Sequence, residues 1–184
     1  MPNKVETIII VIVMKRIICL CVIHTYTIVG FAQSLSDLDR NPSFKGITIG
    51  APISKYSNIL RYEGTDKGKN SYVITDQTVL SVFNIKMDRG VVLEKDGKVD
   101  AILLFKTYSP GIFNVKELEV LQSSLTSRYG RPNVDLTDFS GTPSVAGVRW
   151  QASSTMIDVA YLFYGTDKPG SGLRYLLYKR NDDY

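Results

Sequence analysis

The chain has 184 residues, of which 44% are apolar and 22% are charged. These are the proportions of a globular protein with one domain and a proper hydrophobic core, and they exclude a disordered chain. The formal net charge is +4 and the basic residues are spread along the sequence, which excludes the basic patch of a nucleic-acid-binding protein.

Residues 1–32 have the pattern of a signal peptide. A short basic start at Met14 (MKR) precedes an apolar run, and the small residues Gly30 and Ala32 stand at −3 and −1 of a cleavage site before Gln33. We therefore predict that translation begins at Met14 and that a peptidase cuts between Ala32 and Gln33. The mature protein would then be exported, to the periplasm or out of the cell.

Cleavage there would change the chemistry that the chain can perform, because Cys19, Cys21 and His24 all lie in the leader. A chain without thiol or imidazole has no disulfide, no Cys or His metal ligand and no Ser-His-Asp or Cys-His catalysis. The net charge would fall from +4 to +2, because three basic residues and one acidic residue would leave. The alternative is an uncleaved membrane anchor, although residues 17–32 are short and polar for a bilayer helix.

After the leader we expect a flexible lead-in over residues 33–45 and a single α+β domain over 46–184. A short strand is predicted at 46–49. Apolar residues at helical spacing predict a short helix from Ile53 to Leu60. Two glycines in a polar run predict a loop over 63–71.

The next block is rich in β-branched and aromatic residues. Strands are predicted at 71–75 and 78–87, followed by a strand that ends near Lys95. Asp96-Gly97 between two apolar runs is a strong hairpin signal, because both central residues of a type I′ turn need positive φ. The returning strand, 99–105, is so apolar that we expect a central position in the sheet.

The strongest helix signal lies between Asn114 and Gly130. Asn114 is a good N-cap, and Glu117 stands where a capping box would place it. Phe113 would form a hydrophobic staple with the residue at N4, and Gly130 suits a left-handed C′ position. An apolar stripe recurs along one face of this helix at Leu118, Leu121, Leu125 and Tyr129.

The chain ends with an irregular connection over 133–146 and three strands, at 147–152, 154–164 and 172–180. The predicted fold class is therefore α+β: a largely antiparallel sheet of about six to eight strands with two helices packed on one face. Each half places a helix before hairpins, and the strings GTDKG (64–68) and GTDKP (165–169) recur. Either a duplicated helix-then-hairpin unit or shared turn chemistry accounts for this. The order resembles small periplasmic modules of the β-lactamase-inhibitor-protein and outer-membrane-assembly type, in architecture alone.

No motif identifies a catalytic, cofactor-binding or metal-binding residue, so we expect a protein that is not an enzyme and needs no cofactor. Asp158 and Asp100 interrupt apolar strands, and we expect both to face solvent. The alternative is that Asp158 serves a carboxylate-based hydrolase. Acidic residues around Gly97 do not match a calcium loop, and the 63–71 segment lacks the phosphate-binding pattern.

Aromatic residues gather near the C-terminal end and form the candidate binding surface. Exposed clusters of Tyr and Trp often mark interfaces, but the same residues also pack well beneath a helix. The residues in question are Trp150, Tyr161, Tyr164, Tyr175 and Tyr178. The leading hypothesis is a non-enzymatic exported module that binds a protein or cell-envelope component. The alternatives are a carrier for a small apolar ligand, held in a cleft between helix and sheet, and the hydrolase.

Overall fold

A computed structural model describes residues 34–109, 112, 114–141, 143–164 and 170–180. The predicted signal peptide, the staple residue Phe113 and the GTDKP string lie outside the described residues. Within those residues, no helix combines the length and the apolar character that crossing a membrane requires.

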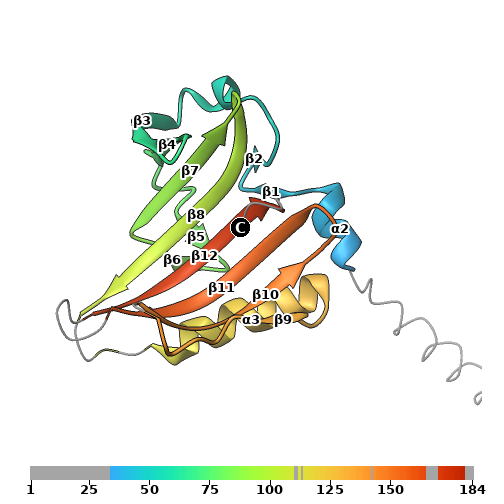
Figure 1. The fold of residues 1–184 in the computed structure, drawn as a ribbon, viewed down its shortest axis with the longest axis vertical. Helices are drawn as coiled ribbons and strands as arrows, with labels where there is room; N and C mark the ends of the chain where they lie inside the picture. Colours follow the sequence, from blue (N-terminus) through green and yellow to red (C-terminus); the bar gives the residue numbers. More distant parts are fainter. Residues whose placement is uncertain (1–33, 110–111, 113, 142, 165–169, 181–184) are drawn as a thin grey trace, which may run out of the picture. The chain divides into compact units, whose positions relative to one another are not determined.

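The described residues form an eight-stranded antiparallel sheet, which confirms the predicted α+β class (Figure 1). Neighbouring strands are paired in the order β3-β4-β7-β8-β12-β11-β10-β9. The central position expected for the apolar strand after Asp96-Gly97, now β8, is also confirmed. The bounds are β3 Leu60–Asp66, β4 Lys69–Ile74, β7 Arg89–Lys95, β8 Lys98–Tyr108, β9 Val134–Asp135, β10 Ser144–Gln151, β11 Thr155–Phe163 and β12 Ser171–Lys179.

Each half of the sheet is a meander of four strands, and the halves join where β8 pairs with β12. Leu104 and Tyr175 are partners in this central pairing. A duplicated unit would have this order of strands. The element before β3 is only a four-residue 3₁₀ helix, η1 (Ile53–Tyr56), whereas a full helix precedes β9. Duplication therefore stays a prediction.

Helix α3 (Val115–Tyr129) is the predicted helix, and its apolar stripe packs into the main core. Leu121, Leu125 and Tyr129 are buried, while Leu118 is half-buried. Burying each leucine stabilises the fold by about 1.5–3 kcal/mol relative to leaving it in water. The helix contacts β11 and so lies over the second half of the sheet (Figure 1).

The ends of α3 are only partly as predicted. Gly130 has φ +82, and its amide donates to the Thr126 carbonyl, which confirms the need for glycine there. The Asn114 side chain makes no cap bond, and the capping box is wrong. Glu117 instead accepts from Lys106 Nζ at 2.7 Å and from the Tyr108 hydroxyl, because two donors on β8 face this turn.

The second helix, α2 (Leu35–Arg40), lies in the segment expected to be a flexible lead-in. Leu38 is only 1% exposed and joins the same core cluster as α3. Asp39 accepts backbone amides from Ser153 (2.9 Å) and Ser154 (3.0 Å), which ties α2 to the β10–β11 turn. Burial opposes ionisation of Asp39, but the hydrogen bond from the Ser154 hydroxyl and these two amide bonds prevail and lower its pKa.

Two predictions for the first half are wrong. The helix over 53–60 is only η1, and Leu60 already pairs with Ile74 as the start of β3. The predicted loop over 63–71 is the β3–β4 hairpin, whose turn residues Lys67 and Gly68 both have positive φ. β3 is an edge strand, where charged residues are tolerated and even protective.

The predicted strand over 78–87 is also wrong, because it folds back on itself as β5 (Ser81–Val82) and β6 (Ile85–Lys86). A similar small hairpin forms from β1 (Ser43–Phe44) and β2 (Ile47–Thr48). The core cluster of α3 also includes buried residues from both hairpins. At one neighbouring position, Gly90 on β7, a Cβ would meet the end of the Leu80 side chain at 2.6 Å, so a larger residue there would require the core side chains to shift.

Candidate functional site

The two faces of the eight-stranded sheet differ in what covers them. We call the face under α3 the helix face, and the opposite one the open face. Both described helices and both small hairpins contribute to the core cluster on the helix face. Strand pairing places one continuous row on the open face: Arg149, Asp158, Leu176, Leu103, Val91 and Val73.

The structure does not gather the five predicted aromatic residues on one surface. Trp150, Tyr161 and Tyr175 are buried on the helix face, and the Trp150 indole donates to the Gly130 carbonyl at 2.8 Å. Tyr178 is buried on the open face. Only Tyr164 is half-buried, with its ring 6.3 Å from that of Phe105 at an interplanar angle of 71°. Side chains alternate along β12, so Tyr175 and Tyr178 point to opposite faces of the sheet. Four of the five residues are buried in the core, and the five do not form one exposed surface.

The expectation that Asp158 faces solvent is wrong. It is 2% exposed, and both carboxylate oxygens accept from Arg149, at 2.7 Å and 3.1 Å. The Tyr178 hydroxyl also lies 3.3 Å from one oxygen. Hydrogen bonding to Asp158 is the main reason that the pKa of Arg149 is raised. The carboxylate is thus the centre of a structural ion pair.

The expectation that Asp100 faces solvent is also wrong. It is also buried, and it accepts from Lys69 Nζ at 2.8 Å. Asp158 meets its cation on the neighbouring strand β10, and Asp100 meets Lys69 on β4, with β7 between them. The spacing within one strand could not reveal either partner.

A hollow of about 430 Å³ lies on the open face, next to the ion pair between Arg149 and Asp158. Its wall holds an ion pair between Arg89 and Glu63 at 2.5 Å. Arg174 is less well satisfied: its Nη2 is 3.9 Å from Asp158, and its buried Nε has no hydrogen-bond partner among the described residues. The apolar lining residues are Val91, Leu103, Phe105, Leu162 and Tyr164.

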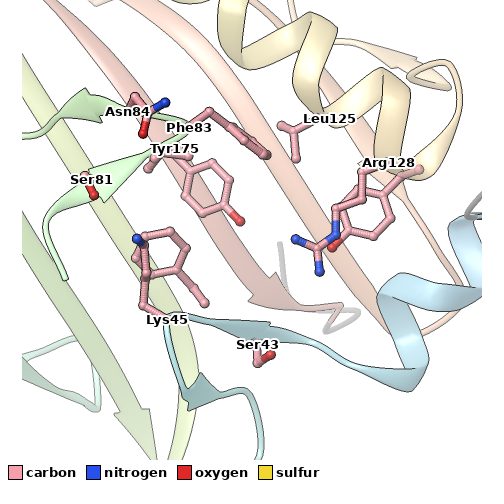
Figure 2. A pocket seen from close by; sticks show the side chains of 11 residues that line it. Ser43, Lys45, Ser81, Phe83, Asn84, Leu125, Arg128 and Tyr175 are labelled. Atoms are coloured by element: carbon pink, nitrogen blue, oxygen red, sulfur yellow. The ribbon is translucent and has the colours of Figure 1, made fainter.

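A second cavity, which we call the inner pocket, lies on the helix face (Figure 2). Its volume is about 310 Å³, and it opens between α3, β12, β1 and the β5–β6 hairpin. It has the position that the sequence analysis gave to a ligand cleft between helix and sheet. The lining residues are Ser43, Phe44, Lys45, Ser81, Val82, Phe83, Asn84, Leu125, Arg128, Tyr129 and Tyr175.

The floor of the inner pocket is Tyr175, whose ring lies 5.5 Å from that of Phe44. Burial raises the pKa of Tyr175 well above its usual range, and burial likewise raises the pKa of Tyr129. The Arg128 guanidinium lies 5.3 Å from the Tyr129 ring centre and extends toward the space in front of the Tyr175 hydroxyl (Figure 2). Except for Tyr175, the sequence analysis missed these pocket residues. Lys45-Gly46 and Phe83-Asn84 could have been read as turn dipeptides.

Comparisons with protein-family models, with curated proteins and with solved structures find no match for this chain. In the part of the chain that the structure describes, no three His, Cys, Asp or Glu side chains group as a metal site would require. The function must therefore be argued from the two cavities and their residues.

Proposed function

We propose that this chain is a non-enzymatic binding protein that holds a segment of a partner protein on the open face of its sheet. The observation that carries the proposal is Arg174, a guanidinium left short of partners beside an apolar hollow. The chemistry that fits is an apolar side chain of the partner with a carboxylate close to it.

The apolar residues on the open face support the proposal that a partner covers this face. An antiparallel sheet with one face in water normally carries polar residues on that face. Here Leu176, Leu103 and Val91 follow each other across three paired strands, all half-buried. A protein segment that covered them would remove apolar area from water, which is the main driving force for association.

The positive charge of Arg174 supports a partner that carries a carboxylate. The side chain of Arg174 is 27% exposed, so a ligand can reach it, although its ion pair with Asp158 is too long for a hydrogen bond. A carboxylate placed there would form charge-assisted hydrogen bonds, which are about twice as strong as neutral ones. The proposal includes the predicted cleavage after Ala32, so the expected partner is an exported protein or a protein of the cell envelope.

Site-specific photo-cross-linking in the native cell tests the proposal. A photoreactive residue at Leu103 should form a cross-linked product with one protein, and Arg174→Met in the same chain should weaken that product. The matched position is Val120, which is 42% exposed on the outer side of α3 and should form none. Equal products from both positions, or no product from Leu103, would contradict the proposal.

A further inference from the structure

We propose that the inner pocket is a second, separate binding site, which takes a small aromatic carboxylate. The site lies on the helix face, so it neither uses nor depends on the open face. Four independent features of the pocket support it: its charge, its floor, its rim and its size.

The charge of the lining favours an anion. Two cationic side chains, Lys45 and Arg128, line the inner pocket, and no acidic residue does. No carboxylate among the described residues pairs with either cation. The acid that acts on Tyr129 from nearby is Asp37, and Arg40 and the Ser34 amide already bind it. Both cations are exposed, so a ligand carboxylate can reach them, and Arg128 also interacts with the ring and the hydroxyl of Tyr129.

The floor offers an unused donor. Tyr175 is only 5% exposed, and within the described residues its hydroxyl makes no hydrogen bond. The oxygen itself is not one of the buried polar atoms without a partner, so water in the pocket reaches it and a ligand oxygen can take the place of that water. Since burial also raises the pKa of Tyr175, the hydroxyl keeps its proton and can donate to a ligand oxygen.

The rim is strained at two positions. Lys45 and Phe83 each take the first central position of a two-residue hairpin turn, with φ of +47° and +46°. Glycine, asparagine and aspartate are preferred at such positions, and a bulky residue there is a genuine outlier. Phe83 is also 36% exposed, so its own ring does not pack into the core. Lys67 has the same φ in the β3–β4 turn, away from the pocket, so the positive φ does not by itself indicate a site; Lys45 and Phe83 differ from Lys67 because both line the inner pocket.

The size and the rings define the body of the ligand. Four aromatic residues line the pocket: Phe44, Phe83, Tyr129 and Tyr175. Aromatic side chains favour offset or edge-to-face contacts with a ligand ring. A volume of about 310 Å³ is at the lower end of the roughly 300–1,000 Å³ found for small-molecule sites. One ring with a short acid chain fits this space better than a lipid or a nucleotide.

Binding of matched acids and amides to the purified full chain tests this inference. The probes are benzoate, phenylacetate and 3-phenylpropionate, each compared with its amide by ligand-observed NMR and calorimetry. At least one acid should bind, and its amide should bind about tenfold more weakly, because the amide cannot form the charge-assisted bond to Arg128. Comparable binding of acid and amide, or no binding of any acid at millimolar concentration, overturns the inference.

Variants locate the site. Arg128→Gln should weaken binding of the acid about tenfold. Lys116→Gln removes a cation from the first turn of the same helix, about 18 Å away along its axis, and should leave binding unchanged. Phe83→Gly should raise the midpoint of thermal unfolding, because it relieves the positive φ, and yet weaken binding. If Phe83 has a structural role only, Phe83→Gly will raise the unfolding midpoint and leave the affinity for the acid unchanged. That result would also overturn the inference.

Discussion

Arg149 on β10 and Asp158 on β11 stand directly opposite each other, joined by hydrogen bonds of 2.7 Å and 3.1 Å. The Tyr178 ring lies 5.6 Å from the Arg149 guanidinium, and Arg174 approaches Asp158 from β12. The pair therefore connects three neighbouring strands on the open face. Removing one partner of a buried ion pair is costly, because the other charge stays buried without compensation.

Asp158→Asn should for this reason lower the free energy of unfolding by about 2–3 kcal/mol, somewhat less than for a fully buried pair because Arg149 is a quarter exposed. Urea unfolding measures this. Asp66→Asn, on an exposed edge strand, is the matched control and should change little. The hydrolase hypothesis makes the opposite prediction, that Asp158→Asn keeps its stability and loses an activity.

Gly172→Ala should destabilise the fold by about 1–3 kcal/mol. A Cβ at this position would meet Cε2 of Phe105 at 2.7 Å, because the Phe105 ring lies over the glycine on the open face. The substitution should also disturb the Phe105–Tyr164 ring contact. Gly141→Ala is the control, since its nearest contact is 3.4 Å. Equal unfolding midpoints for the two variants would show that Phe105 moves aside without cost.

Stability should fall as the pH rises above about 10. Burial, followed by the charge of Asp158, raises the pKa of Tyr178 to about 12. The folded state then holds a proton that the unfolded state has released, so the contribution is complete below pH 10 and is lost toward pH 12. Urea unfolding across this range measures the slope, and Tyr178→Phe should reduce it. An unchanged slope in the variant would assign the loss to other groups.

The mature protein should begin at Gln33. The intact mass of the protein from its native cell, together with the fraction in which it is found, checks the predicted cleavage. A mass that starts near Gln33 in an exported fraction would mean a chain without Cys19, Cys21 and His24. A mass that includes residues 14–32, found in the membrane fraction, would contradict the predicted cleavage. The protein would then keep these three side chains as possible functional groups.

Several elements could be predicted from the sequence because their signals are local. The turn at Asp96-Gly97 forms as expected, with φ of +53° and +77° at its two residues. Gly130 ends α3 at a positive φ, and the stripe of α3 faces the core. In each case neighbouring residues along the chain hold the determining chemistry, as caps, turns and periodic apolar positions do.

Other features depended on partners far away in the sequence, and only the tertiary structure decided them. Glu117 accepts from Lys106 and Tyr108 on β8 instead of capping its own helix, and the polar segment 63–71 forms the β3–β4 hairpin because its two ends pair with each other. Strand pairing likewise buried Asp158 against Arg149. Both cavities arise between segments that the chain brings together from distant positions. Local chemistry determines where elements begin and end, whereas the choice of hydrogen-bond and packing partners is made across the whole fold.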